Sequence, residues 1–159
     1  MRYHRLGKEE LEELQQEMAH FLAAQSITAH EWETIKMENP KRADELLDQF
    51  SDMVIHRALN NIKVLRIVSQ HELYLFLFEE KNARVMHFYL PPESPHAFTD
   101  AATLEAVSSG KITLKDIQAT CYKGEKTLTD REAEMYALVV QGAVPCSKED
   151  YEMLVAGFG

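Results

Sequence analysis

Two apolar runs separated by a short polar turn occupy the middle of the chain and predict a β-hairpin. Residues 73–79 and 84–90 are rich in Leu, Phe, Tyr and Val, a composition typical of strands. The polar residues between them include Asn82, which can adopt the positive φ that tight turns use. We therefore expect two antiparallel strands joined by a turn at this place.

Alternation along the two runs sorts their side chains onto two faces. With a loop at 81–82, Phe76 lies opposite His87, and Glu79 forms a cross-strand charge pair with Arg84. The first face is mostly aliphatic and consists of Leu73, Leu75, Leu77, Met86, Phe88 and Leu90. The second is mostly aromatic and consists of Tyr74, Phe76, Phe78, Val85, His87 and Tyr89. We expect the first face to be core, whereas the pattern leaves the burial of the second face open.

A further strand is predicted before the hairpin. The run at 62–68, IKVLRIV, is β-branched and partly alternating, so the strands 62–68, 73–79 and 84–90 are expected to form a three-stranded antiparallel meander. Helical patterns lie on both sides of the meander, and this order of elements predicts an α+β fold. No linker or repeat divides the chain, so we expect a single domain over residues 1–159.

Apolar residues at helical spacing predict amphipathic helices before and after the meander. The N-terminal stripes run over 8–24 and 40–59, and a short helix is expected over 100–108. Another helix is expected to begin at 113 and to include Cys121. Polar N-cap residues predict where helices start: Thr28, Asn39, Thr113, Thr129 and Ser147.

Several stretches together resemble a known group of proteins. The opening YHRLGKEELEEL, the segment WETIKMENPKRADELLDQFSDMV and the strands that follow are similar to an uncharacterised family of short bacterial proteins, found mostly in Bacteroidetes. The similarity covers nearly the whole chain. It implies a bacterial, cytoplasmic setting and assigns no activity, substrate or functional residue.

Charge and composition narrow the classes of partner. Lys and Arg number 17 against 26 Asp and Glu, so the net charge is -9, and the basic residues do not cluster; nucleic-acid binding is not expected. No apolar run approaches the roughly 18 residues of a membrane span, and the N-terminus lacks an apolar signal core. We expect a cytoplasmic protein without a membrane partner, with Cys121 and Cys146 as free thiols.

The sharpest candidate for chemistry is a line of acidic residues in the helix expected over 40–59. Asp44, Asp48, Asp52 and His56 follow one another at intervals of four residues, so they share one face of the helix. Carboxylates and an imidazole in this arrangement can share a divalent metal ion, and a solvated acidic face is the structural alternative. On the metal interpretation the protein is a small metal-dependent enzyme that uses Asp48, Asp52 and His56.

The leading hypothesis is a non-enzymatic protein-interaction or accessory protein, because no motif for a nucleophile, a phosphate loop or a cofactor is present. The predicted partner is another protein or a second copy of the chain, since an uncovered aromatic sheet face forms a large apolar patch. The residues expected at this surface are Tyr74, Phe76, His87, Tyr89 and, in the proline-rich loop after the hairpin, His96.

Overall fold

The computed structural model describes residues 1–156 and 158. Backbone contacts divide the chain into two compact units, Met1–Asn60 and Asn61–Gly159, and each unit is described by itself. The expectation of a single domain stays a prediction. No helix of the described residues is both long and apolar enough to cross a membrane.

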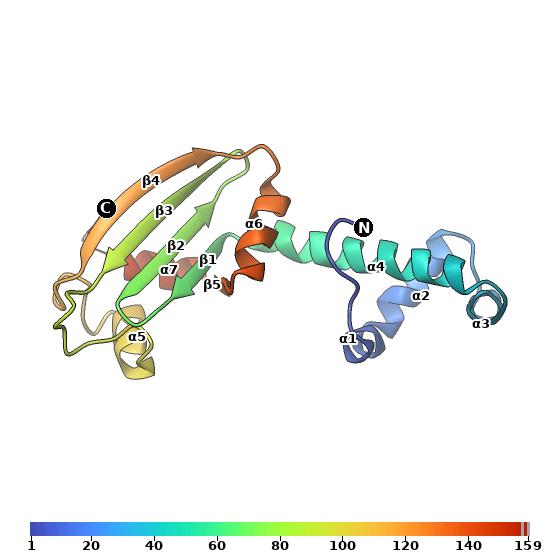
Figure 1. Cartoon of the computed structure of the whole chain (residues 1–159), viewed down its shortest axis with the longest axis horizontal. Helices are drawn as coiled ribbons and strands as arrows, with labels where there is room; N and C mark the ends of the chain where they lie inside the picture. Colours follow the sequence, from blue (N-terminus) through green and yellow to red (C-terminus); the bar gives the residue numbers. More distant parts are fainter. Residues whose placement is uncertain (157, 159) are drawn as a thin grey trace. The chain divides into compact units, whose positions relative to one another are not determined.

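The N-terminal unit is helical, with α1 (Lys8–Glu13), α2 (Gln15–Ala24), α3 (Ala29–Glu38) and α4 (Pro40–Asn61) (Figure 1). The helix expected over 8–24 is interrupted at Leu14, where φ is -102° and ψ is 25°. The apolar spacing continues across this residue, so the sequence pattern carries no sign of the break. Two predicted caps are confirmed, because Thr28 accepts a hydrogen bond from the Glu31 amide at 3.1 Å and Asn39 from the Arg42 amide at 3.2 Å.

The C-terminal unit contains a five-stranded antiparallel sheet in the order β4-β3-β2-β1-β5. The strands are β1 (Val64–Val68), β2 (Glu72–Phe78), β3 (Asn82–Tyr89), β4 (Thr120–Thr127) and β5 (Val144–Cys146). The α+β class and the three central strands are therefore confirmed. The predicted meander was incomplete, because one further strand pairs with each of its sides.

The register of the hairpin differs from the predicted one by two residues. Phe76 lies opposite Val85, and Tyr74 lies opposite His87. The two-residue loop is Glu80-Lys81, which has no positive φ. Because the shift is an even number of residues, every side chain keeps its predicted face.

Asn82 belongs to β3 instead of the turn, and its side chain contacts β4. Its Nδ2 donates a hydrogen bond to Glu125 Oε1 of β4 at 2.8 Å, a contact with a strand that the hairpin alone does not reveal. The predicted charge pair between Glu79 and Arg84 does form, with 3.3 Å between Oε1 and Nε, although the two residues are not directly opposite.

The strand β4 stands where a helix was expected, and that prediction was wrong. The predicted cap is present, since Thr113 and Asp116 exchange hydrogen bonds of 2.8 and 3.1 Å. The turn that they start ends at Gln118, whose φ is 61°, and the chain then extends along β3. The described helices of this unit are α5 (Ala101–Ser108), α6 (Arg131–Val140) and α7 (Lys148–Leu154). Ser147 caps α7 as predicted, whereas α6 is capped by Asp130 and not by Thr129.

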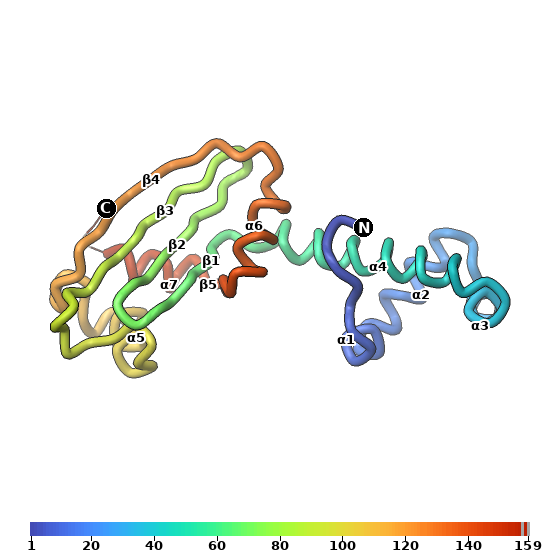
Figure 2. Tube along the Cα trace, in the orientation of Figure 1, coloured from blue at the N-terminus to red at the C-terminus, as the bar shows by residue number. Residues whose placement is uncertain are grey.

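The two faces of the sheet are covered differently. The aliphatic face is core as predicted, packed against α5, α7 and the segment 112–119, with Leu73, Leu75 and Phe88 fully buried. In the view of Figure 2, α7 passes behind the strands and α6 lies in front of them. Arg131 ties the start of α6 to the sheet by donating hydrogen bonds to the backbone carbonyls of Glu79 at 3.0 Å and Ile62 at 2.6 Å.

Candidate functional site

The aromatic face of the sheet is covered at one end and open at the other. Phe78, beside α6, is 4% exposed, whereas Tyr89 at the far end is 37% exposed. Tyr122 of β4, directly opposite His87, adds a side chain that is 60% exposed. We call the open part the tyrosine surface; it consists of Glu72, Tyr74, His87, Tyr89 and Tyr122.

The rings of the tyrosine surface form a continuous series of contacts across three strands. His87 stacks on Tyr74 with 3.8 Å between ring centroids and 14° between planes, and lies 3.9 Å from Tyr89. Tyr89 meets Tyr122 edge to face, with centroids 5.5 Å apart and planes at 89°. The pair therefore places two exposed rings at right angles to each other.

A carboxylate lies beside these rings. Glu72 is directly opposite Tyr89, and its Oε1 lies 3.3 Å from Nε2 of His87. Partial burial against its neighbours, followed by the charge of Glu72, raises the pKa of the Tyr89 hydroxyl. The tyrosine surface therefore combines aromatic rings with a carboxylate.

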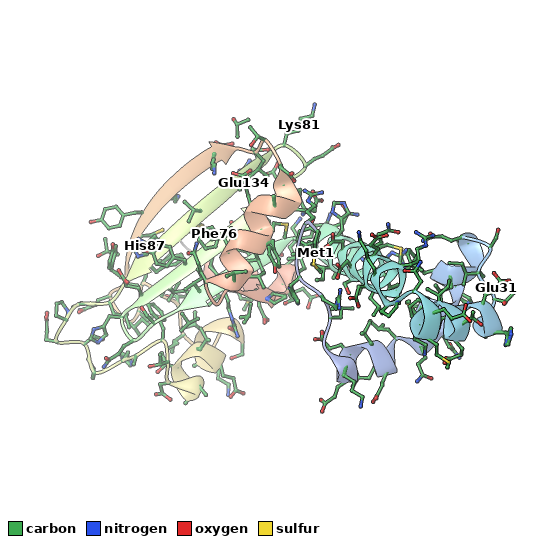
Figure 3. The ribbon with its side chains drawn as sticks, turned by 45° about the vertical axis from the view of Figure 1, so that its right-hand side comes forward. Met1, Glu31, Phe76, Lys81, His87 and Glu134 are labelled. Atoms are coloured by element: carbon green, nitrogen blue, oxygen red, sulfur yellow. The ribbon has the colours of Figure 1, made fainter. Side chains whose placement is uncertain are left out.

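Phe76 borders a groove beneath α6 instead of the open surface. The groove has a volume of about 410 Å³ and is mostly apolar, lined by Phe76, Phe78, Ala83, Arg84, Val85, Gly124, Glu125, Lys126, Leu128, Glu134, Ala137 and Leu138. An ion pair between Lys126 and Glu134 stands at its rim, and the lysine lowers the pKa of Glu134. Figure 3 shows Phe76 and His87 on the same side of the sheet as α6.

The predicted interaction residues fall into two groups. The structure brings Tyr74, Phe76, His87 and Tyr89 together on one sheet face. His96 lies elsewhere, in a hollow of about 210 Å³ that Pro91 and Asp116 also line. That these residues contact a partner stays a prediction.

Sequence reasoning missed Tyr122 and Glu72 as members of this surface. Tyr122 directly follows Cys121, which was expected in a helix because Leu114, Ile117 and Cys121 follow helical spacing. The signal that points to a strand is the run of Thr120, Tyr122 and Thr127 among exposed polar residues, which is typical of an edge strand.

The acidic line of α4 holds the N-terminal segment. The carboxylate of Asp52 accepts hydrogen bonds from the backbone amides of Arg2 at 2.7 Å and Tyr3 at 2.9 Å. His56 Nδ1 lies 2.8 Å from the Tyr3 hydroxyl, and Arg5 Nε donates to Asp48 Oδ1 at 2.7 Å. We call this set of contacts the N-terminal clamp.

Two further contacts of the N-terminal clamp are a buried hydrogen bond and a weaker ion pair. The Leu6 amide donates to Ser51 Oγ at 3.1 Å, and both residues are buried. Asp44 Oδ1 lies 3.3 Å from Arg5 Nη1 at an exposed position. The hydrogen bond from Arg5 lowers the pKa of Asp48. Asp44, Asp48 and Asp52 are thus engaged with Arg2, Tyr3 and Arg5.

The metal interpretation receives no support from this arrangement. Asp48, Asp52 and His56 each face a different group of the N-terminal segment. Within residues 1–156 and 158, no three His, Cys, Asp or Glu side chains are grouped so that they could share an ion. Cys121 and Cys146 are free, and burial raises the pKa of both thiols, which favours their unreactive protonated form.

A comparison with protein families places the chain. Residues 1–157 match the profile described as "Family of unknown function (DUF6495)". The chain belongs to this family. The resemblance noted from the sequence is thereby confirmed at the level of a family of unknown function, while the bacterial source of the family stays a prediction. No curated protein and no solved structure matches the chain.

Proposed function

We propose that this protein is a non-enzymatic interaction protein that binds an arginine- or lysine-bearing segment of a partner protein on the tyrosine surface. The observation that carries the proposal is the perpendicular pair of exposed rings, Tyr89 and Tyr122, beside the carboxylate of Glu72. A cation within about 6 Å of a tyrosine ring is attracted by its π-face, and a nearby carboxylate adds charge attraction.

The rest of the molecule is consistent with such a partner. The net charge of -9 attracts a basic segment over a long range at low ionic strength. The series of stacked rings also holds Tyr74, His87 and Tyr89 in place before binding, so little side-chain freedom is lost when a partner docks.

A titration followed by NMR tests the proposal. The probe is the peptide acetyl-Gly-Arg-Gly-Arg-Gly-amide, and its control replaces each arginine by citrulline, which has the same shape without the charge. We expect the arginine peptide to shift the backbone amide signals of Tyr89 and Tyr122 and to bind about tenfold more tightly than the citrulline peptide, as a contact of about 1.4 kcal/mol requires.

Two variants separate the tyrosine surface from other exposed apolar positions. Tyr122→Leu keeps an apolar side chain and removes the ring, so it should abolish the preference for arginine. Met37→Ala changes a side chain that is 82% exposed in the N-terminal unit and should leave binding unchanged. Equal binding of both peptides, or an arginine preference that survives Tyr122→Leu, would overturn the proposal.

A further inference from the structure

The two edges of the sheet differ in their capacity to accept another strand. β5 has only 3 residues, and Pro145 at its centre has no N–H to donate. β4 has 8 residues, contains no proline and pairs with β3 without a break from Thr120 to Thr127. A long, regular edge strand is a template for strand pairing, whereas a short strand with a proline resists it. β4 is therefore the edge at which the sheet can be extended.

The residues of β4 are arranged for pairing with a copy of the same strand. All of them except Cys121 are exposed. Lys123 and Glu125 stand on either side of Gly124 and project to the same face of the sheet, since side chains alternate along a strand. At the next positions outward, Tyr122 and Lys126 project to the opposite face.

We infer that β4 pairs antiparallel with β4 of a second copy of this chain, around a two-fold axis at Gly124. With the axis perpendicular to the sheet, residues equally far from Gly124 on the two strands lie opposite each other. Lys123 then faces the partner's Glu125, and Glu125 faces the partner's Lys123. Opposite charges at directly facing positions stabilise a strand pair.

The next pair of positions also fits this register. Tyr122 faces the partner's Lys126, whose aliphatic stem can pack against the tyrosine ring while its ammonium group keeps the ion pair with Glu134 of its own chain. Gly124 faces the partner's Gly124, so no side chain stands at the axis. The absence of a side chain is also required inside the chain, since a Cβ at this position would lie 2.9 Å from Cγ1 of Val85.

Neighbouring registers are disfavoured by charge. An axis at Lys123 places two lysines opposite each other, and an axis at Glu125 places two glutamates opposite each other.

The contacts of Lys123 and Glu125 within one chain leave hydrogen-bond donors and acceptors for the pairs across the interface. Lys123 donates to the Phe158 carbonyl oxygen, and its ammonium group has three N–H donors in all. Glu125 accepts one hydrogen bond from Asn82, and a carboxylate has about four acceptor sites.

This inference does not depend on the function proposed for the tyrosine surface. Lys123 and Glu125 project from the other face of β4, away from Tyr122. Charge changes at these two positions therefore test the strand pairing and leave the rings of the tyrosine surface in place.

A charge-exchange experiment tests the register by sedimentation velocity over a range of protein concentrations at low salt. Lys123→Glu and Glu125→Lys each place like charges at two facing positions, so each variant alone should dimerise about 10- to 100-fold more weakly than the unmodified chain. An equimolar mixture of the two variants should regain the dimer, because the exchanged charges face each other in the mixed pair. The double variant Lys123→Glu/Glu125→Lys should regain it as well.

Lys81→Glu provides the control for Lys123→Glu, because it makes the same change in net charge at the exposed turn between β2 and β3 (Figure 3). It should not alter dimerisation. Circular dichroism of each variant confirms that it is folded. An unmodified chain that stays monomeric at every concentration overturns the inference. The inference is also overturned if neither single variant weakens the dimer. It is overturned as well if the single variants weaken the dimer but the mixture and the double variant do not restore it.

Discussion

Replacing Asp52 should release the N-terminal segment from α4. The carboxylate of Asp52 accepts the backbone amides of Arg2 at 2.7 Å and Tyr3 at 2.9 Å, so Asp52→Ala removes two hydrogen bonds to a charged acceptor. A hydrogen bond to a charged group contributes about 1.5–3 kcal/mol, and the exposure of the Arg2 bond reduces its share to about 0.5–1.5 kcal/mol, so the pair together starts at about 2 kcal/mol. We therefore expect the segment to be held less tightly by about 2–3 kcal/mol.

The effect is measured at the Leu6 amide, which donates to the buried Ser51 hydroxyl at 3.1 Å and exchanges with solvent only when the segment opens. A loss of about 2–3 kcal/mol predicts hydrogen exchange at Leu6 that is roughly 30- to 150-fold faster, since each 1.4 kcal/mol is a factor of ten. Asp52→Asn keeps one acceptor oxygen and should give an intermediate rate.

Asp44→Ala is the matched control for this prediction. Asp44 lies on the same line of α4, but its carboxylate only meets Arg5 at 3.3 Å and its side chain is 60% exposed. Exposed ion pairs contribute about 0.2–1 kcal/mol, so exchange at Leu6 should quicken by less than about sixfold. If the Leu6 amide exchanges at the same rate in Asp52→Ala as in the unmodified chain, or if Asp44→Ala accelerates it equally, the N-terminal clamp does not act as described.

Three further predictions concern the C-terminal unit. Leu75→Ala removes a fully buried side chain from the aliphatic face and should lower the free energy of unfolding by about 2–5 kcal/mol, measured by urea titration. An effect below about 1 kcal/mol would contradict the packing of this face. Gly110→Ala should also lower the midpoint of unfolding, because Gly110 has a φ of +79°, a conformation that an alanine adopts only with strain. An unchanged midpoint would contradict the positive φ at this turn. The hydrogen bond from Lys126 lowers the pKa of Glu134 in the folded protein. The stabilisation from this pair is therefore fully present above the ordinary glutamate pKa of about 4.3, and it is lost as the pH falls through the lower pKa of the folded state. Glu134→Gln should therefore lower the free energy of unfolding by about 0.2–1 kcal/mol at pH 7 and by nothing near pH 2, and a constant difference between the two pH values would refute the assignment.

Local patterns predicted much of the fold because their causes are local. The caps at Thr28, Asn39 and Ser147 form as expected, since each side chain bonds an amide only three residues away. The limit of such reasoning is seen at Thr113, where the cap forms and the helix does not follow. What comes after the first turn there depends on β3, which is distant in sequence and offers its edge to residues 120–127.

In the candidate sites, too, local spacing predicted part of the arrangement and long-range contacts decided the rest. The spacing of Asp48, Asp52 and His56 placed them on one face of a helix, which the structure bears out, but their partners in the N-terminal segment are 43 to 53 residues away. The sequence offered no means to choose these partners. Tyr122 also joins the tyrosine surface through a long-range pairing, opposite His87, from a strand whose first residues local spacing had assigned to a helix.

The sequence by itself determined which hairpin side chains share a face, because alternation has a period of two and survives the two-residue shift between the predicted and observed registers. Only the tertiary structure decided the register itself, the addition of β4 and β5, and the extent to which α6 covers the aromatic face. Those outcomes depend on hydrogen bonds and packing between segments far apart in the chain, and no local pattern encodes them. The tyrosine surface and the open edge of β4 both result from that long-range pairing.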